Sequence, residues 1–588
     1  MSFTTRPTLR GYGGAVSAGH YLATQIGAQQ LAAGGNAADA ACAMGFALQV
    51  VEPTQNGPAG EVPILVYDAA EDRTYAISGQ GPAPAAASIE TMRRLGIDRI
   101  PPDGFLAATV PAALDAWCRL LEQFGTRSLS DVLSPARSLA ERGFPMYRFL
   151  QAVLQFVARR FEAEWPTSAA IYCPIREIGE RQTNPALAGF FTGLIEAERG
   201  AQGGREAGIR AARDSFYRGR TAEQIEAFLR VPIRDITGRE HAGLLSADDL
   251  ANYSGCVEPP LSVGYRGAEV WKCGPWSQGP VFLQQLRLLE GFDLSAMGQG
   301  SVDAIHIWIE CAKLAYADRD ANYGDPDFVK VPLDVLLSEA YATERRTLVD
   351  PNSTSLDLRP GIGRLPEGWP LLSNAGRPSA IEPQALAAAE GRRDTTQLVA
   401  ADAFGNLICA TPSGGWLPSS PVIGELGFPI GTRAQMFALD ATHPNALEPG
   451  KRPRTTLTPS LARLPDGRRM AFGTPGGDQQ DQWTSQFFVN LIDHGVRDLQ
   501  LAIDHPTVHS LHMPSSFYPR LAELGVVAAE NRFEPEILSQ LEARGHQIRR
   551  GQAWEHGRVL AVTSDPDTGQ LEAAASPRSG VAYAGILP

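Results

Sequence analysis

The stretch that most constrains the fold of this chain begins at two consecutive threonines, Thr395 and Thr396. A polar run precedes them at 390–394, and two apolar runs follow at 398–401 and 407–410, joined by turn-forming residues. Short apolar runs separated by turn chemistry are typical of a β-hairpin. The sequence therefore predicts a hairpin that begins abruptly at the two threonines.

The position of these threonines also has a chemical consequence. A threonine hydroxyl is a weak nucleophile unless a base lies beside it. Cleavage between Asp394 and Thr395 would make Thr395 the first residue of a chain. Its α-amine, whose pKa is near neutral, would then lie within reach of its own hydroxyl. An isolated pair of threonines more often only begins an ordinary strand, so this hypothesis depends on the rest of the chain.

Composition narrows the possible function classes. The chain has 588 residues and a formal net charge of −13. This acidic balance, without any run of Lys and Arg, argues against a nucleic-acid partner. None of the seven cysteines is paired at C-x-x-C spacing, which gives no zinc or thioredoxin signature and fits a reducing compartment. We see no secretory signal and no apolar run long enough to span a bilayer, so we expect a cytoplasmic protein without membrane contact.

The order of the expected elements indicates an α+β protein. Helices are expected at 20–34 and 37–51, and the second is apolar on nearly all sides and should be buried. Residues 146–235 are mostly helical, and 302–318 shows the spacing of an amphipathic helix. Residues 351–394 are rich in Pro, Gly and polar residues, which is typical of a flexible or processed segment. Short strands predominate beyond it.

Eight short motifs occur in order along nearly the whole chain. They are Ala32-Ala33-Gly34-Gly35-Asn36-Ala37-Ala38-Asp39-Ala40-Ala41, Val110-Pro111, Asp248-Asp249-Leu250, Tyr265-Arg266-Gly267, Ala315-Tyr316-Ala317-Asp318-Arg319, Asp394-Thr395-Thr396, Pro449-Gly450-Lys451-Arg452-Pro453 and Gly473-Thr474-Pro475-Gly476-Gly477. Each is weak alone, but in this order the chain resembles the γ-glutamyltransferase family of N-terminal-nucleophile (Ntn) hydrolases. The resemblance implies a four-layer α/β/β/α sandwich of two stacked, mainly antiparallel sheets, with additional helices in the N-terminal portion.

The resemblance also implies a precursor that cleaves itself between Asp394 and Thr395. The products would be residues 1–394, a helix-rich large subunit, and residues 395–588, a small subunit that starts at the nucleophile. The two would intertwine as one structural unit, which could pair as a homodimer of heterodimers. The resemblance implies a small-molecule amide substrate and neither a cofactor nor a metal.

The resemblance assigns catalytic roles to four residues. Thr395 would attack first the preceding carbonyl and later the amide of the substrate, while Ser413 would hydrogen-bond the nucleophile. Gly476 and Gly477 would form the oxyanion hole, because two successive glycines let backbone N–H groups converge on one point. Losing one such donor typically lowers the rate by about 10²–10³. The structural alternatives are a turn serine and an ordinary glycine-rich turn.

The resemblance also assigns substrate-binding residues. Thr455 and Thr456 match a hydroxyl pair that binds the α-carboxylate of a γ-glutamyl donor, although both could equally be strand residues. Gln435 matches a glutamine that contacts the α-amino group of the donor. Gln80 stands where the family has an arginine for the α-carboxylate, and a neutral amide cannot replace a bidentate guanidinium.

Two further positions depart from the family pattern. Ala438 replaces the acid that binds the α-ammonium group, and Gly415 replaces an asparagine used there. Losing these charged contacts should weaken binding by several kcal/mol, at about 1.5–3 kcal/mol per charged hydrogen bond. The acyl donor is therefore expected to differ from a free γ-glutamyl group, and residues 416–418 and 436–437 could offer an apolar wall. Three arginines remain candidates for a displaced anion contact: Arg433, Arg452 and Arg454.

The leading hypothesis is therefore a self-processing Ntn amidohydrolase that works through an acyl-threonine intermediate. Its donor could be a γ-glutamyl compound such as glutathione, a dicarboxylic monoamide such as oxamate, or an acylated amine of the cephalosporin type. One hypothesis from another class is an uncleaved scaffold. Another is a metal-dependent hydrolase that uses His505, His509 and His512, although Pro506 and Pro514 interrupt any helix that would bring these histidines together.

Overall fold

The computed structural model describes residues 3–365, 371–372 and 395–588. Two seven-stranded sheets form its centre, and all pairings within them are antiparallel. The first sheet has the order β1 (Leu9–Gly11), β24 (Leu571–Ala575), β23 (Leu560–Ser564), β18 (Arg469–Gly473), β17 (Ser460–Arg463), β11 (Ala268–Lys272) and β10 (Leu261–Tyr265). The second has the order β25 (Tyr583–Leu587), β2 (Gly14–Ala18), β13 (Leu398–Asp402), β14 (Leu407–Ala410), β3 (Ile64–Asp68), β4 (Arg73–Ile77) and β9 (Val257–Glu258).

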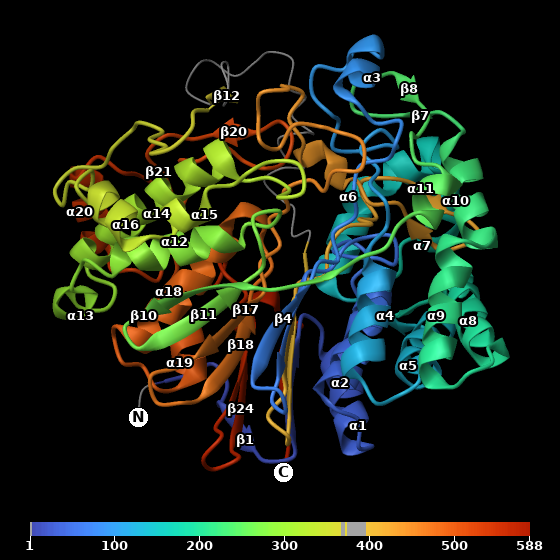
Figure 1. Ribbon diagram of the computed structural model, residues 1–588, viewed down its shortest axis with the longest axis horizontal. Coiled ribbons are helices and arrows are strands. Elements are labelled where there is room, and N and C mark those ends of the chain that lie inside the picture. The colour runs from blue at the N-terminus through green and yellow to red at the C-terminus, as the bar shows by residue number, and fades with distance from the viewer. Residues whose placement is uncertain (1–2, 366–370, 373–394) are drawn as a thin grey trace.

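Helices cover the outer face of each sheet (Figure 1). The second sheet is covered by α1 (Tyr21–Ala32), α2 (Ala37–Val51) and α4 (Ala113–Phe124), and α5 (Leu129–Arg142) packs on α2. The first sheet is covered by α12 (Gly279–Leu289), α18 (Gln480–Ile492) and α19 (Leu499–Asp504), and α14 (Val302–Asn322) packs on α12. The predicted α+β class and the four-layer order are thus confirmed.

The remaining elements extend these layers. The additional N-terminal helices are α3 (Ile89–Arg94), α6 (Arg148–Glu164), α7 (Pro166–Tyr172), α8 (Pro185–Gly200), α9 (Arg205–Tyr217), α10 (Arg220–Leu229) and α11 (Ala247–Ala251). Shorter helices follow at α13 (Leu294–Met297), α15 (Leu333–Leu336), α16 (Glu339–Arg346) and α20 (Pro535–Ala543). The short strands are β5 (Phe144–Pro145), β6 (Arg181–Gln182), β7 (Ile233–Arg234), β8 (Glu240–His241), β12 (Leu371–Leu372), β15 (Val422–Ile423), β16 (Phe428–Pro429), β19 (Val508–Ser510), β20 (Leu521–Ala522), β21 (Val526–Ala529) and β22 (Gln547–Arg550).

Strand β13 shows why its sequence suits the middle of such a sandwich. Side chains alternate between the two faces of a strand. Leu398 and Ala400 belong to the core shared with the helices, whereas Val399 and Ala401 belong to the core between the two sheets. Because both faces are buried, the strand is apolar at every one of these positions, which is the pattern expected of a sheet covered on both sides.

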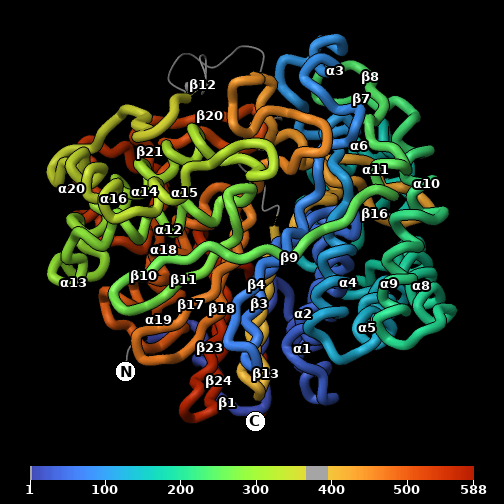
Figure 2. Tube along the Cα trace, in the orientation of Figure 1, coloured from blue at the N-terminus to red at the C-terminus, as the bar shows by residue number. Residues whose placement is uncertain are grey.

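Segments from the two sides of Thr395 are interleaved in both sheets. In the second sheet β13 and β14 lie between β2 and β3, and Leu398 pairs with Ala18 while Cys409 pairs with Leu65. Figure 2 shows strands from the two ends of the chain side by side, such as β1 and β24. Neither side of Thr395 therefore has a complete sheet of its own.

Two expectations from the sequence need comment. The helix expected at 302–318 is longer, and it is not amphipathic, because every residue of α14 except Asp303 is buried. Helices α12 and α20 and strand β19 all pack on it, so it has no solvent-facing side. The segment predicted to be flexible or processed lies mostly outside the described residues. Among the residues that are described, no helix is long and apolar enough to cross a membrane.

Candidate active site

Thr395 lies directly opposite Ser413. The β13–β14 hairpin pairs Leu398 with Ala410. In the same register Thr395, three residues before Leu398, lies opposite Ser413, three residues after Ala410, in a β-bridge. Their hydroxyl oxygens are 3.2 Å apart, and both residues are buried. The predicted cleavage partner Asp394 lies outside the described residues.

Glu61 and Arg433 both lie beside Ser413. Glu61 and Ser413 exchange two backbone hydrogen bonds of 2.9 Å each. Arg433 forms an ion pair with the Glu61 carboxylate and donates a 2.8 Å hydrogen bond to Ser413 Oγ. The guanidinium also lies over the ring of Trp416, 4.6 Å from its centroid. Arg433 is therefore committed to Glu61 and Ser413.

Gly476 and Gly477 form a turn between β18 and α18 that only glycine fits. Their φ angles are +136° and +57°, a region that side-chain-bearing residues rarely adopt. A Cβ on Gly476 would lie 2.1 Å from the ring of Trp483, and one on Gly477 would lie 3.0 Å from the ring of Phe517. The turn is thus packed between two aromatic rings.

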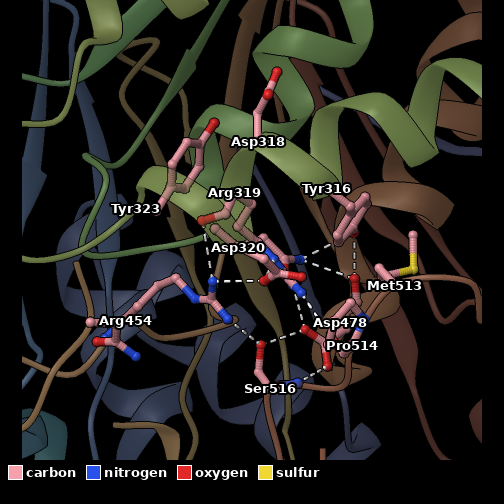
Figure 3. A network of polar contacts seen from close by, with 12 residues as sticks. Tyr316, Asp318, Arg319, Asp320, Tyr323, Arg454, Asp478, Met513, Pro514 and Ser516 are labelled. Atoms are coloured by element: carbon pink, nitrogen blue, oxygen red, sulfur yellow. Dashed lines mark hydrogen bonds and ion pairs between the residues drawn. The ribbon is translucent and has the colours of Figure 1, made fainter. Parts of the chain in front are cut away.

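A buried network of charges holds the residue that follows this turn (Figure 3). The carboxylate of Asp478 pairs with Arg319 and accepts hydrogen bonds from the backbone N–H (2.8 Å) and the hydroxyl (2.6 Å) of Ser516. Its backbone carbonyl accepts a hydrogen bond from the Tyr316 hydroxyl. Burial alone would raise the pKa of Asp478, but Arg319 and the Ser516 hydrogen bonds outweigh burial and lower it. Two motifs of the sequence, one around Arg319 and one around Gly476, are therefore parts of one structure.

The same network accounts for Arg454. Its guanidinium contacts Asp320 at 2.8 Å and Ser516 Oγ at 3.0 Å, and Asp320 in turn contacts Arg319 at 3.0 Å. Arg452 is similarly committed, because it forms a fork with both carboxylate oxygens of Asp325. All three arginines considered for a displaced anion contact are thus paired with acids.

The proposed substrate-binding residues lie on separate loops. Gln435 is buried in the 3₁₀ turn 433–436, and its amide contacts the backbone at Thr432 (3.2 Å) and at Tyr518 (3.4 Å). Gln80 and Thr456 are buried, and Gln80 Oε1 and Thr456 Oγ1 have no hydrogen-bond partner among the described residues. Thr455 is buried and donates its backbone N–H to the carbonyl of Trp276 at 2.8 Å.

Two polar residues near Thr395 have structural partners. Thr411 donates its hydroxyl to Gln397 Oε1 at 2.7 Å. The Gln397 amide also fills the space beside Gly473, where a Cβ would lie 2.6 Å from it. These contacts tie the hairpin of the second sheet to strand β18 of the first.

The three histidines considered as metal ligands have different surroundings. His509 packs edge-on against Trp483 and His556, with ring centroids 5.3 and 4.7 Å apart. His512 contacts the carbonyl of Asp357 at 3.2 Å, and His505 lies beside Gly300. In the part of the chain that the structure describes, no three His, Cys, Asp or Glu side chains gather as a metal site.

Comparison with known proteins places the chain in a family. It matches the gamma-glutamyltranspeptidase family over residues 23–586. The chain belongs to this family. We predicted a γ-glutamyltransferase-like amidohydrolase or acyltransferase, and the family and the names of its members, which are hydrolases and acylases, confirm this prediction. The Ntn-hydrolase fold is confirmed as well.

Named relatives include both hydrolases and acylases. The Acylase ACY 1 proenzyme of Pseudomonas sp. (strain SE83) is 32% identical, over 96% of this chain and 91% of the relative. The Glutathione hydrolase proenzyme of Escherichia coli (strain K12) is 30% identical, over 96% of this chain and 90% of the relative. Among solved structures, LmbA2991HD has 46% identity and a TM-score of 0.93 with both chains fully covered. The cephalosporin acylase from Bacillus halodurans has 28% identity and a TM-score of 0.82 over 100% of this chain and 98% of that one.

Sequence reasoning missed several residues that shape this site. It did not identify Glu61, which lies in a loop of small residues, or Phe517 and Trp483, which enclose the glycine turn. Arg319 was noted only as part of a motif. A signal for Glu61 was nevertheless present, because a lone acid in a small-residue loop flanked by buried apolar segments needs a buried partner.

Proposed function

We propose that this protein is a self-processing amidohydrolase whose nucleophile is Thr395. Cleavage between Asp394 and Thr395 would yield chains 1–394 and 395–588, which stay together because each contributes strands to both sheets. The observation that carries this proposal is the buried Thr395–Ser413 hydroxyl pair, 3.2 Å apart at the start of the hairpin. The proenzyme relatives support the same conclusion.

The reaction would proceed in two balanced steps. The Thr395 hydroxyl attacks the amide carbonyl of the substrate and passes its proton to its own α-amine. The negative charge that develops on the carbonyl oxygen is stabilised by backbone N–H groups of Gly476 and Gly477. The amine product leaves with that proton, and a threonine ester remains. Water then attacks the ester by the same route and releases the acid; an amine in place of water would give transfer.

The site favours an acyl donor without the paired charges of a free γ-glutamyl group. A zwitterionic donor needs a cation for its α-carboxylate, and the three arginines considered for this role are already paired with acids. The atoms that do lack partners, Gln80 Oε1 and Thr456 Oγ1, are uncharged. Trp416 and Phe517, with ring centroids 6.1 Å apart, lie between Arg433 and the glycine turn. We therefore favour an apolar or aromatic acyl group held by neutral hydrogen bonds.

The competing candidate is a glutathione hydrolase, which the relative from Escherichia coli supports by its name. Release of glutamate from glutathione at a rate comparable with the best acyl amide would establish it and would overturn our choice of donor.

The seven unpaired cysteines support a reducing compartment such as the cytoplasm. Native mass measurement would decide whether two heterodimers associate.

Intact mass under denaturing conditions tests the nucleophile. The wild-type protein should give two chains that part before Thr395, whereas Thr395→Ala should remain one chain. Thr396→Ala is the matched control, because it removes the neighbouring buried hydroxyl and should still be cleaved. A wild-type protein that remains uncut would instead favour the scaffold hypothesis. If the wild type is cleaved, the purified two-chain protein is screened on glutathione, oxamate and aromatic acyl amides.

A further inference from the structure

The ion pair between Glu61 and Arg433 is placed where it can control the hydroxyl of Ser413. Both side chains are buried, at 2% and 0% exposure. Two hydrogen bonds join the Glu61 backbone to that of Ser413, and the Glu61 carboxylate is held by its ion pair with Arg433. A Cβ on Gly414 would lie 2.4 Å from Glu61 Oε2, which explains why glycine follows Ser413.

Arg433 is held from several directions at once. Its Nε and Nη2 atoms both face Glu61, and Nη1 lies 3.7 Å from the sulfur of Met436. Trp416 covers the flat face of the guanidinium. Because the guanidinium is planar and already held in place, it loses little further conformational entropy when it hydrogen-bonds Ser413. A lysine ammonium could not reproduce this geometry. The Nη2 atom is therefore a fixed donor toward Ser413 Oγ.

This arrangement assigns a direction to the hydrogen bond between Ser413 and Thr395. A guanidinium can only donate, so Ser413 Oγ must accept from Arg433. The nearby positive charge makes that oxygen a poorer acceptor for a second hydrogen bond and makes its own O–H a stronger donor. We propose that Arg433, held by Glu61, is a positioning residue that makes Ser413 donate its proton to Thr395 Oγ1.

The consequence for the chemistry rests on the function proposed above for Thr395. If Ser413 donates to Thr395 Oγ1, the proton of Thr395 points away from Ser413 and is available to the base. As Thr395 attacks, its proton goes to that base, and the hydrogen bond from Ser413 stabilises the negative charge that builds on the oxygen. Ser413 keeps its own proton throughout, and Arg433 never touches the substrate.

Self-cleavage provides a test that needs no known substrate. Because the nitrogen of Thr395 is still part of a peptide bond at this stage, cleavage tests the hydrogen bond from Ser413 to the attacking oxygen and not the α-amine base. The protein is made by cell-free synthesis, and the fraction cleaved is followed by intact mass for the wild type, Arg433→Lys, Ser413→Ala and the double variant. Losing a hydrogen bond to a charged group should slow cleavage about 10- to 100-fold in Arg433→Lys. Because Arg433 acts through Ser413, the same change in the Ser413→Ala background should have less than about a threefold further effect. Ser413→Thr, which keeps a hydroxyl, should keep the dependence on Arg433.

Arg452→Lys is the matched control for general damage. Arg452 is also a buried arginine that forks onto a carboxylate, Asp325, and donates to a serine, Ser78, at 3.0 Å. The Arg452→Lys variant should have a lower thermal unfolding midpoint, as Arg433→Lys does, but it should cleave itself at nearly the wild-type rate. Independent, multiplicative effects of the Arg433 and Ser413 changes would overturn the positioning role alone. Cleavage of Thr395→Ala would overturn the proposed nucleophile, and the positioning role with it.

Discussion

Replacing Asp478 with asparagine should weaken both the fold and the chemistry, because this residue joins the glycine turn to a buried charge network. Two arginines, Arg319 and Arg454, face two carboxylates, Asp320 and Asp478, so these four charges balance one another (Figure 3). Asp478→Asn keeps the shape of the side chain but leaves one buried positive charge without compensation.

The magnitude follows from the burial of these groups. Arg319 is 0% exposed and Asp478 is 4% exposed. Removing one partner of such a buried pair typically lowers the free energy of unfolding by about 3–5 kcal/mol. Because the carboxylate also accepts two hydrogen bonds from Ser516, the turn 476–478 should shift, and misplaced N–H donors should lower the rate of catalysis by up to about 10²–10³.

The control is Asp320→Asn, which removes the same charge from the same network without touching the glycine turn. Urea unfolding followed by tryptophan fluorescence should show a similar loss of stability in both variants. The rate of self-cleavage should fall much further in Asp478→Asn. Equal cleavage rates in the two folded variants would refute the claim that the network acts on the turn.

The pH dependence of this variant provides a second check. Burial acts to raise the pKa of Asp478 in the folded protein, but the charge of Arg319 outweighs burial and lowers it. Its ionised form therefore adds stability above its unfolded pKa of about 3.9, and this contribution is lost as the pH falls through the folded pKa. The stability gap between wild type and Asp478→Asn should accordingly be full at neutral pH and shrink below about pH 4. A gap that stays constant on acidification would contradict the charge argument.

Three further variants test separate features. Gly476→Ala should abolish cleavage in a folded protein, because its φ of +136° and the Trp483 ring 2.1 Å from the new Cβ force the turn to move; wild-type cleavage would refute this. Burial raises the pKa of Glu52. Its neutral form therefore stabilises the fold below the unfolded pKa of about 4.3, and this stabilisation is lost as the pH rises through the folded pKa. In Glu52→Gln, the free energy of unfolding measured in urea should change less with pH above about 4.3 than it does in the wild type. Arg452→Gln should cost about 3–5 kcal/mol in urea unfolding and leave the cleavage rate of the folded fraction nearly unchanged, whereas an equal loss in cleavage would assign it to the site.

Local patterns in the sequence predicted the parts of the site that depend on neighbouring residues. The two apolar runs after Thr396 predict a hairpin, and the register of that hairpin is enough to bring Thr395 opposite Ser413. The buried helix α2 was also evident, because it is apolar on nearly all sides. Such features follow from periodicity within a few turns of chain.

The parts that sequence reasoning could not supply are pairings over long separations. Arg433 reads as a free cation until the fold places Glu61, 372 positions away in the chain, against it. Arg452 and Asp325 are 127 positions apart, and Arg319 and Asp478 are 159. A single sequence carries no local signal for such pairs, so whether an arginine binds substrate or holds the fold is decided only by the tertiary structure.

This distinction bears on how the site could recognise its donor. Each arginine considered for anion binding already has an acid, and a second carboxylate brought by a substrate would compete with a pair that is buried and well oriented. Separating such a pair would leave a carboxylate desolvated and unpaired, at a cost of several kcal/mol. A neutral donor avoids this cost, because it needs only hydrogen bonds with uncharged groups, such as the accepting oxygen of Gln80 and the hydroxyl of Thr456. We therefore propose that Arg433, Arg452 and Arg454 hold the structure around Thr395, and that shape and neutral polar contacts select the acyl group.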